Sequence, residues 1–130
     1  MMTRREAFAA LAFALTLSAT GAHAAETVPF DRKAFDAALK GPGPVLIDIS
    51  ATWCSTCAAQ KAVLSQLTRQ ARFAGLTIFE VDYDTEKDVM RTFGAQQRST
   101  LIAFKDGTEV GRIVGDTRPQ AIEALLAKAI

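Results

Sequence analysis

The sequence predicts an α/β fold, a small sandwich in which helices cover a mixed central β-sheet. Three observations indicate it. Helix-like and strand-like segments alternate along the chain, two of the strand-like segments are short and apolar, and a hairpin pattern follows them. Segments of this kind pack as layers around one core. A length of 130 residues allows one domain at most.

The first 24 residues differ in composition from the rest. Two arginines precede the uncharged run AFAALAFALTLSAT, and the small residues Ala22 and Ala24 flank His23. A basic start, a short apolar run and an A-x-A motif are typical of a cleavable secretory signal peptide, and the run is shorter than the roughly 20 residues of a membrane-spanning helix. We therefore predict a signal peptide at residues 1–24, with cleavage near Ala24, and a periplasmic or otherwise exported domain at residues 25–130.

The exported domain is expected to be formally neutral. The signal peptide takes two arginines and one glutamate out of 15 basic and 14 acidic residues, which leaves 13 of each. This balance argues against nucleic acid or an anionic membrane as the main partner. The only histidine leaves with the signal peptide, and an exported compartment lets disulfides persist.

The domain begins with a predicted helix and a predicted strand. Asp31 can cap the helix in VPFDRKAFDAALK, and Phe30 and Phe35 fit a hydrophobic staple around that cap. The GPGP sequence at residues 41–44 ends the helix. The apolar, β-branched run VLIDIS, residues 45–50, then predicts a buried strand.

A second helix is predicted after the cysteines, so that Cys54 lies at or just before its amino end. Its apolar positions at helical spacing are Val63, Leu64, Leu67 and Ala71. The stretch LTIFEVDYD, residues 76–84, predicts a second apolar strand. Residues 85–94 predict a short helix, with Thr85 as a possible cap and Gly94 as its end.

The last part of the chain predicts a hairpin and a closing helix. STLIAFKDGTEVGRIVG turns at residues 105–107, Lys-Asp-Gly, which is typical of a tight β-hairpin. Thr117 and Gln120 fit a T-x-x-Q capping box for the last helix. Its apolar stripe consists of Ile122, Leu125, Leu126 and Ala129.

Cys54 and Cys57 are the only cysteines, and their C-x-x-C spacing leaves several interpretations open. A structural disulfide here would close a minimal loop and contribute about 2 kcal/mol in the chain-entropy model, against ~3 kcal/mol for a 15-residue loop. A zinc site within one exported chain would lack two of its usual ligands. Two chains could instead pool four thiolates around zinc or an iron–sulfur cluster.

A redox couple agrees best with the rest of the sequence. Unpaired N–H groups and the positive end of the helix dipole would stabilise a Cys54 thiolate. Cys57, one turn further along the helix, would attack the bond between Cys54 and a substrate. The spacing, the position between strand and helix, the expected export and the neutral charge all favour a catalytic pair.

At these residues the chain resembles the thioredoxin family, over essentially all of residues 25–130. VLIDISATWCSTC is similar to the family's strand with a buried aspartate and its W-C-x-x-C motif, and LTIFEVDYD to its next strand. STLIAFKDGTEVGRIVG resembles its final hairpin, with Gly115 before the last helix. The resemblance implies a thioredoxin-like three-layer sandwich and thiol–disulfide oxidoreductase chemistry that needs no cofactor and no metal.

The resemblance also implies roles for individual residues. Cys54 would be the attacking nucleophile, Cys57 the resolving thiol, and Trp53 a part of the substrate surface, unless Trp53 is an ordinary core residue. Asp48 matches the buried carboxylate, and burial should raise its pKa, which suits it to take the proton of Cys57. Relief of Asp48 by solvent or by the strand end is the alternative.

The loop before the hairpin departs from the family. Ser99, between Arg98 and Thr100, stands where the family usually has a substrate-binding cis-proline. A cis bond at a non-proline residue costs roughly 2.5–4 kcal/mol, which favours a trans bond here. Arg98 would either place a positive charge near Cys54 and favour acidic partners, or be a solvated loop residue. That proline also keeps metals off the cysteines in the family, so its loss leaves a metal-sharing dimer open.

Three further residues are expected to tune the couple. Ser55 and Thr56 replace the family's Gly-Pro, a dipeptide that strongly influences the reduction potential. Glu80 stands where many thioredoxins have a lysine beside the buried aspartate. A Glu80 that points inward would raise the pKa of one of two carboxyl groups, and one that points outward would be a solvated strand residue.

We therefore expect an exported, monomeric enzyme that acts on protein disulfides or dithiols, with reduction as the favoured direction. A reductant outside the cytoplasm must be recharged, which implies a membrane electron relay of the DsbD/CcdA kind as a partner. The alternative is a non-catalytic thioredoxin-like binding module, for example a dimer that shares a metal or an iron–sulfur cluster through Cys54 and Cys57.

Overall fold

The computed structural model describes residues 24–130, so the predicted signal peptide lies outside the described residues apart from Ala24. Five strands form one sheet: β1 (Glu26–Pro29), β2 (Val45–Ser50), β3 (Thr77–Asp82), β4 (Thr100–Lys105) and β5 (Thr108–Val114). The helices are α1 (Arg32–Lys40), α2 (Ser55–Leu67), α3 (Lys87–Thr92), α4 (Pro119–Ala127) and the 3-10 helix η1 (Ala71–Phe73). Within the described part of the chain, none of the helices combines the length and the apolar content needed to cross a membrane.

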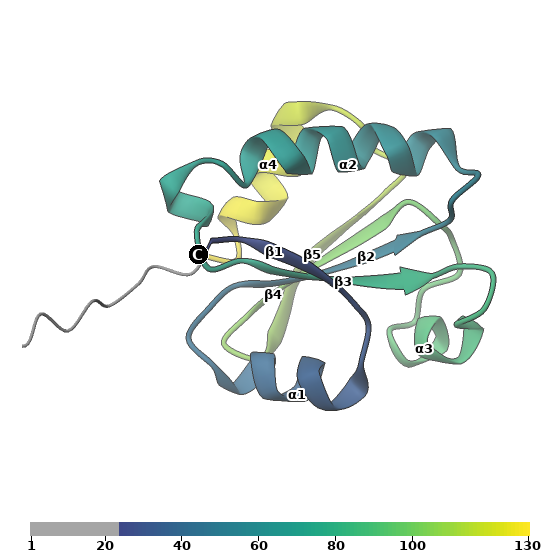
Figure 1. Cartoon of the computed structure of the whole chain (residues 1–130), viewed down its shortest axis with the longest axis horizontal. Helices are drawn as coiled ribbons and strands as arrows, with labels where there is room; N and C mark the ends of the chain where they lie inside the picture. The colour runs from purple at the N-terminus through teal and green to yellow at the C-terminus, as the bar shows by residue number, and fades with distance from the viewer. Residues whose placement is uncertain (1–23) are drawn as a thin grey trace, which may run out of the picture.

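The elements form three layers (Figure 1). Helices α1 and α3 pack on one face of the sheet, and α2 and α4 pack on the other. The strand order is β1-β3-β2-β4-β5. Strands β1, β3 and β2 run parallel, β4 is antiparallel to β2, and β5 is antiparallel to β4. The predicted α/β sandwich with a mixed central sheet is confirmed.

Strand β2 is the centre of the sheet and positions the site. All six of its residues are buried, because β3 and β4 flank it and helices cover both of its faces. Its register sets Asp48 beside Glu80 of β3 and Leu101 of β4. Since β2 and β3 are parallel, the segments that follow their carboxyl ends meet at one edge of the sheet.

The two faces of the sheet have different cores. On the side of α1 and α3 the core is aromatic, and the ring of Phe35 lies between 5.3 and 5.6 Å, centroid to centroid, from four other phenylalanine rings. These rings belong to Phe30, Phe79, Phe93 and Phe104. On the side of α2 and α4 the core is aliphatic, and it includes all four residues of the predicted stripe on the last helix.

Several predicted local signals are confirmed. The carboxylate of Asp31 caps α1 by accepting a hydrogen bond from the backbone N–H of Ala34 at 2.9 Å, and the Phe30 and Phe35 rings are in contact. The hairpin between β4 and β5 turns through Asp106 and Gly107, which both have positive φ, as a two-residue primed turn requires.

Other local predictions were wrong. Strand β1 was not predicted, because this edge strand is short and mostly exposed and so lacks an apolar pattern. The helix α3 begins after Glu86 rather than after Thr85. The helix α4 has Arg118 as its N-cap residue, without a side-chain cap, so the capping box at Thr117 and Gln120 does not form. The helix after the cysteines ends at Leu67, before Ala71.

Candidate active site

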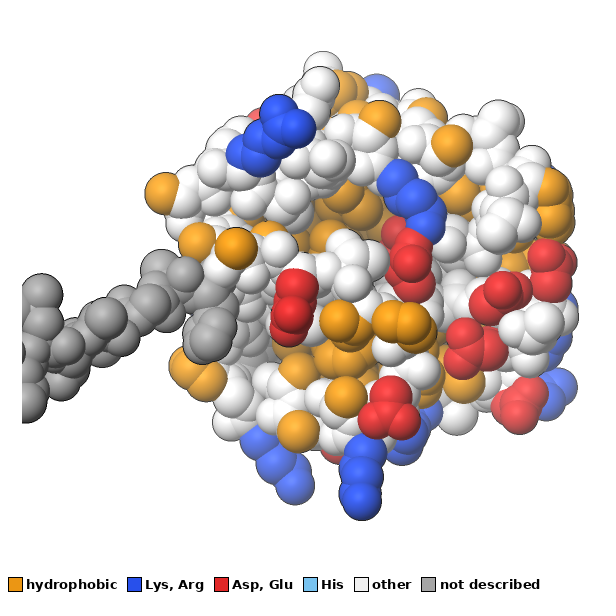
Figure 2. Space-filling view, in the orientation of Figure 1, with side chains coloured by type: hydrophobic (Ala, Val, Ile, Leu, Met, Phe, Trp, Pro, Cys, Tyr) orange, Lys and Arg blue, Asp and Glu red, His pale blue; other side chains and the backbone are white. Residues whose placement is uncertain are grey.

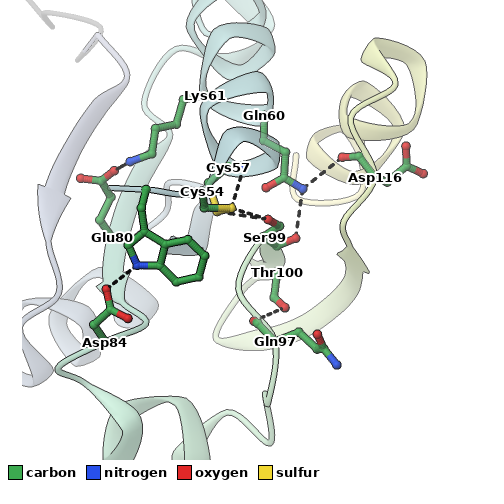
Figure 3. The surroundings of a disulfide bond; sticks show 11 residues. Cys54, Cys57, Gln60, Lys61, Glu80, Asp84, Gln97, Ser99, Thr100 and Asp116 are labelled. Carbon is green, nitrogen blue, oxygen red and sulfur yellow. Dashed lines mark hydrogen bonds and ion pairs between the residues drawn. A yellow bond between two sulfur atoms is a disulfide. The ribbon is translucent and has the colours of Figure 1, made fainter. Parts of the chain in front are cut away.

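The two cysteines lie where β2 passes into α2 and form a disulfide (Figure 3). A turn after β2 brings the N–H of Cys54 to the carbonyl of Ala51 at 3.2 Å, and Cys54 then serves as the N-cap of α2. Its sulfur accepts a hydrogen bond from the N–H of Cys57 at 3.1 Å. The predicted position of Cys54 at a helix amino end is confirmed. That position offers a free N–H and the positive end of a helix dipole to a Cys54 thiolate.

The two sulfur-bearing residues differ in accessibility. Cys54 is 6% exposed and Cys57 only 1% exposed. Cys57 points inward from the first turn of α2, one turn behind Cys54. A substrate sulfur can therefore approach Cys54 more easily than Cys57.

Ser99 contacts both sulfurs. Its hydroxyl oxygen lies 3.2 Å from the sulfur of Cys54 and 3.1 Å from the sulfur of Cys57. The Arg98–Ser99 peptide bond is trans, and Ser99 has a φ of 60°, in the left-handed region. Its N–H donates to the carbonyl of Ile49 in β2 at 2.7 Å, which fixes this loop against the strand that precedes the cysteines.

Gln60 is a site residue that the sequence reading missed. It lies in α2 and is fully buried, and its side-chain amide nitrogen donates to the carbonyls of Ser99 and Asp116, at 3.0 Å each. It thereby ties the loop before β4 and the loop before α4 to the helix that carries the cysteines. The signal was present, because Gln60 precedes Leu64 and Leu67 by four and seven residues and so shares their inward face.

Trp53 lies on the surface next to the disulfide. It is 57% exposed, so it is not a core residue. Its ring nitrogen donates to a carboxylate oxygen of Asp84 at 2.8 Å, and its ring meets that of Tyr83 edge to face. The guanidinium of Arg98 lies 4.8 Å from the Trp53 ring centroid, which is a cation–π contact. Tyr83 and Asp84 follow β3, and only the parallel pairing of β2 and β3 brings them here.

The remaining predicted residues take different positions around the disulfide. Ser55 and Thr56 are the first two residues of α2, with Ser55 exposed and Thr56 half-buried. Thr100 begins β4 and is buried, and its hydroxyl donates to the carbonyl of Gln97 at 2.7 Å. The Thr100 side chain therefore holds the loop that contains Ser99.

Asp48 is a buried carboxylate in β2. Asp48 is 2% exposed, and its oxygen Oδ1 has no hydrogen-bond partner among the described residues. Burial raises the pKa of Asp48 from 3.8 to about 6, and the positive charge of Lys61 opposes part of that rise. Lys61 forms an ion pair with Glu80, and all three side chains line a pocket of about 230 Å³. Glu80 is thus paired with Lys61, which lies in α2 four residues after Cys57. The sequence analysis did not predict a role for Lys61.

A larger pocket, of about 530 Å³, opens beside Cys54. Its lining includes the small residues Ala51 and Ala58 together with Asp82 and Glu86. Acidic side chains gather at this end of the molecule, around the segment that follows β3 (Figure 2). The charge near the disulfide is therefore mixed, since the cation Arg98 lies over Trp53 while the charged residues of the pocket are three acidic residues and Lys61.

The raised pKa of Asp48 predicts an unusual dependence of stability on pH. Because the folded pKa lies above the unfolded value of 3.8, the folded protein holds more protons between about pH 4 and 6, and the free energy of unfolding falls as the pH rises through this window. The difference corresponds to a loss of about 3 kcal/mol. We expect Asp48→Asn to abolish this slope in urea unfolding of the oxidised protein, whereas Asp106→Asn, in the exposed hairpin turn, should keep it. A slope that persists in Asp48→Asn would assign it to another group.

Comparison with known proteins identifies the family. The sequence model described as Thioredoxin matches residues 26–128, which is most of the chain. The chain belongs to the thioredoxin family. It is 37% identical over 87 residues to Thioredoxin Asp f 29 of Aspergillus fumigatus, an alignment that covers 67% of this chain and 78% of that protein. It is 43% identical over 72 residues to a thioredoxin of Mycobacterium tuberculosis, covering 55% of this chain and 61% of that protein.

A solved thioredoxin-like structure agrees with this assignment. The crystal structure of Trxlp from Edwardsiella tarda superimposes with a TM-score of 0.75 and 37% sequence identity, covering 78% of this chain and 98% of that one. Family membership together with the Cys54–Cys57 disulfide makes this thioredoxin-family protein a thiol–disulfide oxidoreductase. Its substrates are protein disulfides, the class on which the family acts.

Proposed function

We propose that the protein is an exported reductant of protein disulfides, with Cys54 as nucleophile and Cys57 as resolving thiol. The observation that supports these roles is the difference between the two sulfurs. Cys54 is the more exposed of the pair, and its sulfur already accepts the N–H of Cys57. The same hydrogen bond would stabilise a thiolate on Cys54 more strongly than it stabilises the disulfide, because bonds to charged acceptors are stronger.

The proposed reaction has two exchange steps. The Cys54 thiolate attacks one sulfur of a substrate disulfide, forms a mixed disulfide, and releases the other substrate sulfur as a thiolate. The Cys57 thiolate then attacks the Cys54 sulfur, breaks the mixed disulfide and releases the second substrate sulfur. Two electrons thus pass from the dithiol to the substrate, and the two protons of the dithiol end on the substrate thiols.

Asp48 is proposed to accept the proton of Cys57 before the second step. A carboxyl group with a pKa of about 6 gains and loses a proton readily near neutral pH. Its oxygen Oδ1 is buried without a hydrogen-bond partner among residues 24–130, and Asp48 lines a pocket that is large enough to hold water. Glu80 would tune Asp48 indirectly, because it pairs with the lysine whose charge lowers the pKa of Asp48.

The substrate surface is proposed to surround the exposed edge of Cys54. Trp53, with Arg98 stacked on it, offers a flat aromatic and cationic face. The loop of Arg98, Ser99 and Thr100 would take the place of the family's cis-proline segment, and a substrate chain would meet it at Arg98, because Ser99 and Thr100 are buried. Ser55 and Thr56, at the start of α2, would set the reduction potential of the couple, since they lie between the two cysteines in the sequence.

Export and recharging complete the proposal. The support for export is the basic, apolar and A-x-A pattern of residues 1–24, which fits cleavage near Ala24. A monomeric reductant in the periplasm would need electrons from a membrane relay of the DsbD/CcdA kind. Once reduced by such a relay, the Cys54–Cys57 pair would serve exported proteins.

The reduction potential of the pair is the experiment that tests this proposal. The protein is recovered from the periplasm of a Gram-negative host, where Ala25 is expected as its first residue, and is equilibrated against a dithiothreitol series. We expect a reversible two-electron transition near the ~−270 mV of thioredoxin. A value near the ~−120 mV of DsbA would make the protein an oxidant instead. The absence of any such transition, in a coloured dimer that chelators bleach, would support the metal-sharing module.

A further inference from the structure

The hydroxyl of Ser99 is the one side-chain group among the described residues that lies within hydrogen-bonding distance of both sulfurs. It lies 3.2 Å from Cys54 Sγ and 3.1 Å from Cys57 Sγ, and Ser99 is buried. A serine hydroxyl carries one proton that rotates toward the better acceptor. An anionic sulfur is a far better acceptor than a sulfur in a disulfide, because charge-assisted hydrogen bonds are stronger.

We infer that the Ser99 hydroxyl is a further catalytic group, which donates a hydrogen bond in turn to whichever sulfur of the pair carries the negative charge. This inference rests on the proposed roles of Cys54 and Cys57. Before the first exchange step the donor serves the Cys54 thiolate. Before the second step it turns to the Cys57 thiolate, over almost the same distance, and its proton stays on the oxygen throughout.

The surroundings of Ser99 hold its hydroxyl in this position. Its N–H donates to Ile49 in β2, and its carbonyl accepts from the N–H of Gly115 at 2.9 Å and from Gln60 at 3.0 Å. Three hydrogen bonds thus fix Ser99, whose φ of 60° is unfavourable for any residue other than glycine. Gln60 also binds the carbonyl of Asp116, so it joins both loops to α2. Gln60 is therefore a positioning residue for the Ser99 hydroxyl.

Removal of the Ser99 hydroxyl should destabilise the Cys54 thiolate and make the Cys54–Cys57 couple more reducing. In Ser99→Ala we expect the thiol pKa of Cys54, measured from the pH dependence of alkylation by iodoacetamide, to rise by about one unit, since a hydrogen bond to a charged group is lost. The reduced state loses more stabilisation than the disulfide state does, because only the reduced state has a charged acceptor for this hydrogen bond. We therefore expect a tenfold change in the redox equilibrium constant with glutathione, which is a potential about 30 mV more negative.

Two variants separate the effect of the Ser99 hydroxyl from the effect of the Ser99 backbone conformation. Ser99→Ala and Ser99→Gly both remove the hydroxyl, but only glycine relieves the positive φ, so an effect common to both belongs to the hydroxyl. Ser50→Ala is the matched control, since Ser50 is a buried serine of β2 whose hydroxyl makes no hydrogen bond to either sulfur in the described part of the chain. The charged residues Asp48, Lys61 and Arg98 are unchanged in all three variants.

A double-mutant cycle tests the part of Gln60. We expect Gln60→Leu to reproduce part of the Ser99→Ala change in the wild-type background and to add nothing in the Ser99→Ala background, because it acts through the hydroxyl. Additive effects would contradict the positioning role. An unchanged thiol pKa and potential in both Ser99 variants would overturn the inference. A wild-type protein without a reversible transition would instead overturn the proposed function, so the two failures are distinguishable.

Discussion

Replacement of Cys54 by serine is expected to reduce turnover of protein disulfides to the rate of the uncatalysed exchange. The reacting species is a thiolate, and a serine hydroxyl in the same place is not ionised near neutral pH, even with the N–H of Cys57 directed at it. The loss should appear in the reduction of insulin disulfides with dithiothreitol as the electron source. Because the residue is small and lies at the N-cap of α2, where serine is a preferred residue, the fold should persist.

Cys57→Ser is the informative counterpart. It keeps the nucleophile but removes the thiol that resolves the mixed disulfide, so a covalent complex between the protein and its substrate should accumulate. The complex should be visible on a non-reducing gel and should disappear with excess dithiothreitol. If the covalent complex accumulated in Cys54→Ser instead of Cys57→Ser, the two roles would be reversed.

The largest loss of stability is expected for Phe35→Ala. Phe35 is buried in α1, and its ring contacts four other phenylalanine rings, one just before α1 and one each from β3, β4 and the end of α3. A truncation there removes buried apolar area and leaves a cavity that these rings cannot fill without moving. We expect the free energy of unfolding to fall by about 3–5 kcal/mol in urea titration of the oxidised protein.

Two controls accompany this measurement. Val114→Ala, at a side chain that is 55% exposed at the end of β5, should change the free energy of unfolding by no more than about 0.5 kcal/mol. Phe35→Leu keeps most of the buried volume and should fall between the two. A loss below about 1 kcal/mol in Phe35→Ala would mean that the aromatic layer repacks around the gap, and that α1 contributes less to the core than its contacts indicate.

The layers of the fold could be predicted because their signals are local. The apolar run at β2, the turn residues Asp106 and Gly107, and the apolar stripe on α4 each depend on neighbours in the sequence. Strand β1 could not be predicted in this way, since it gains its hydrogen bonds from β3, some fifty residues further along the chain. The cap of α4 differs from the prediction because the helix begins one residue later, with Arg118 as its N-cap residue, and the side chain of Asp116 binds the N–H of Arg118.

In the candidate site, too, the residues with local signals could be predicted and the contacts between distant segments could not. The cysteine pair, Trp53 and Asp48 could be found from spacing and resemblance. The contact of Ser99 with both sulfurs could not be predicted, because it depends on a positive φ that the residue type does not favour and that three distant hydrogen bonds maintain. Lys61 was missed because its partner, Glu80, lies on another element.

The complete burial of β2 has a consequence for how motion is distributed in the molecule. Its amides, paired on both sides and covered on both faces, are expected to exchange with deuterium only when the whole domain unfolds. The exposed segments that carry Trp53 and Arg98 should exchange through local opening. The sulfur pair is thus attached to the most protected strand of the protein, while the surface that meets a substrate keeps the freedom to adapt to differently shaped partners.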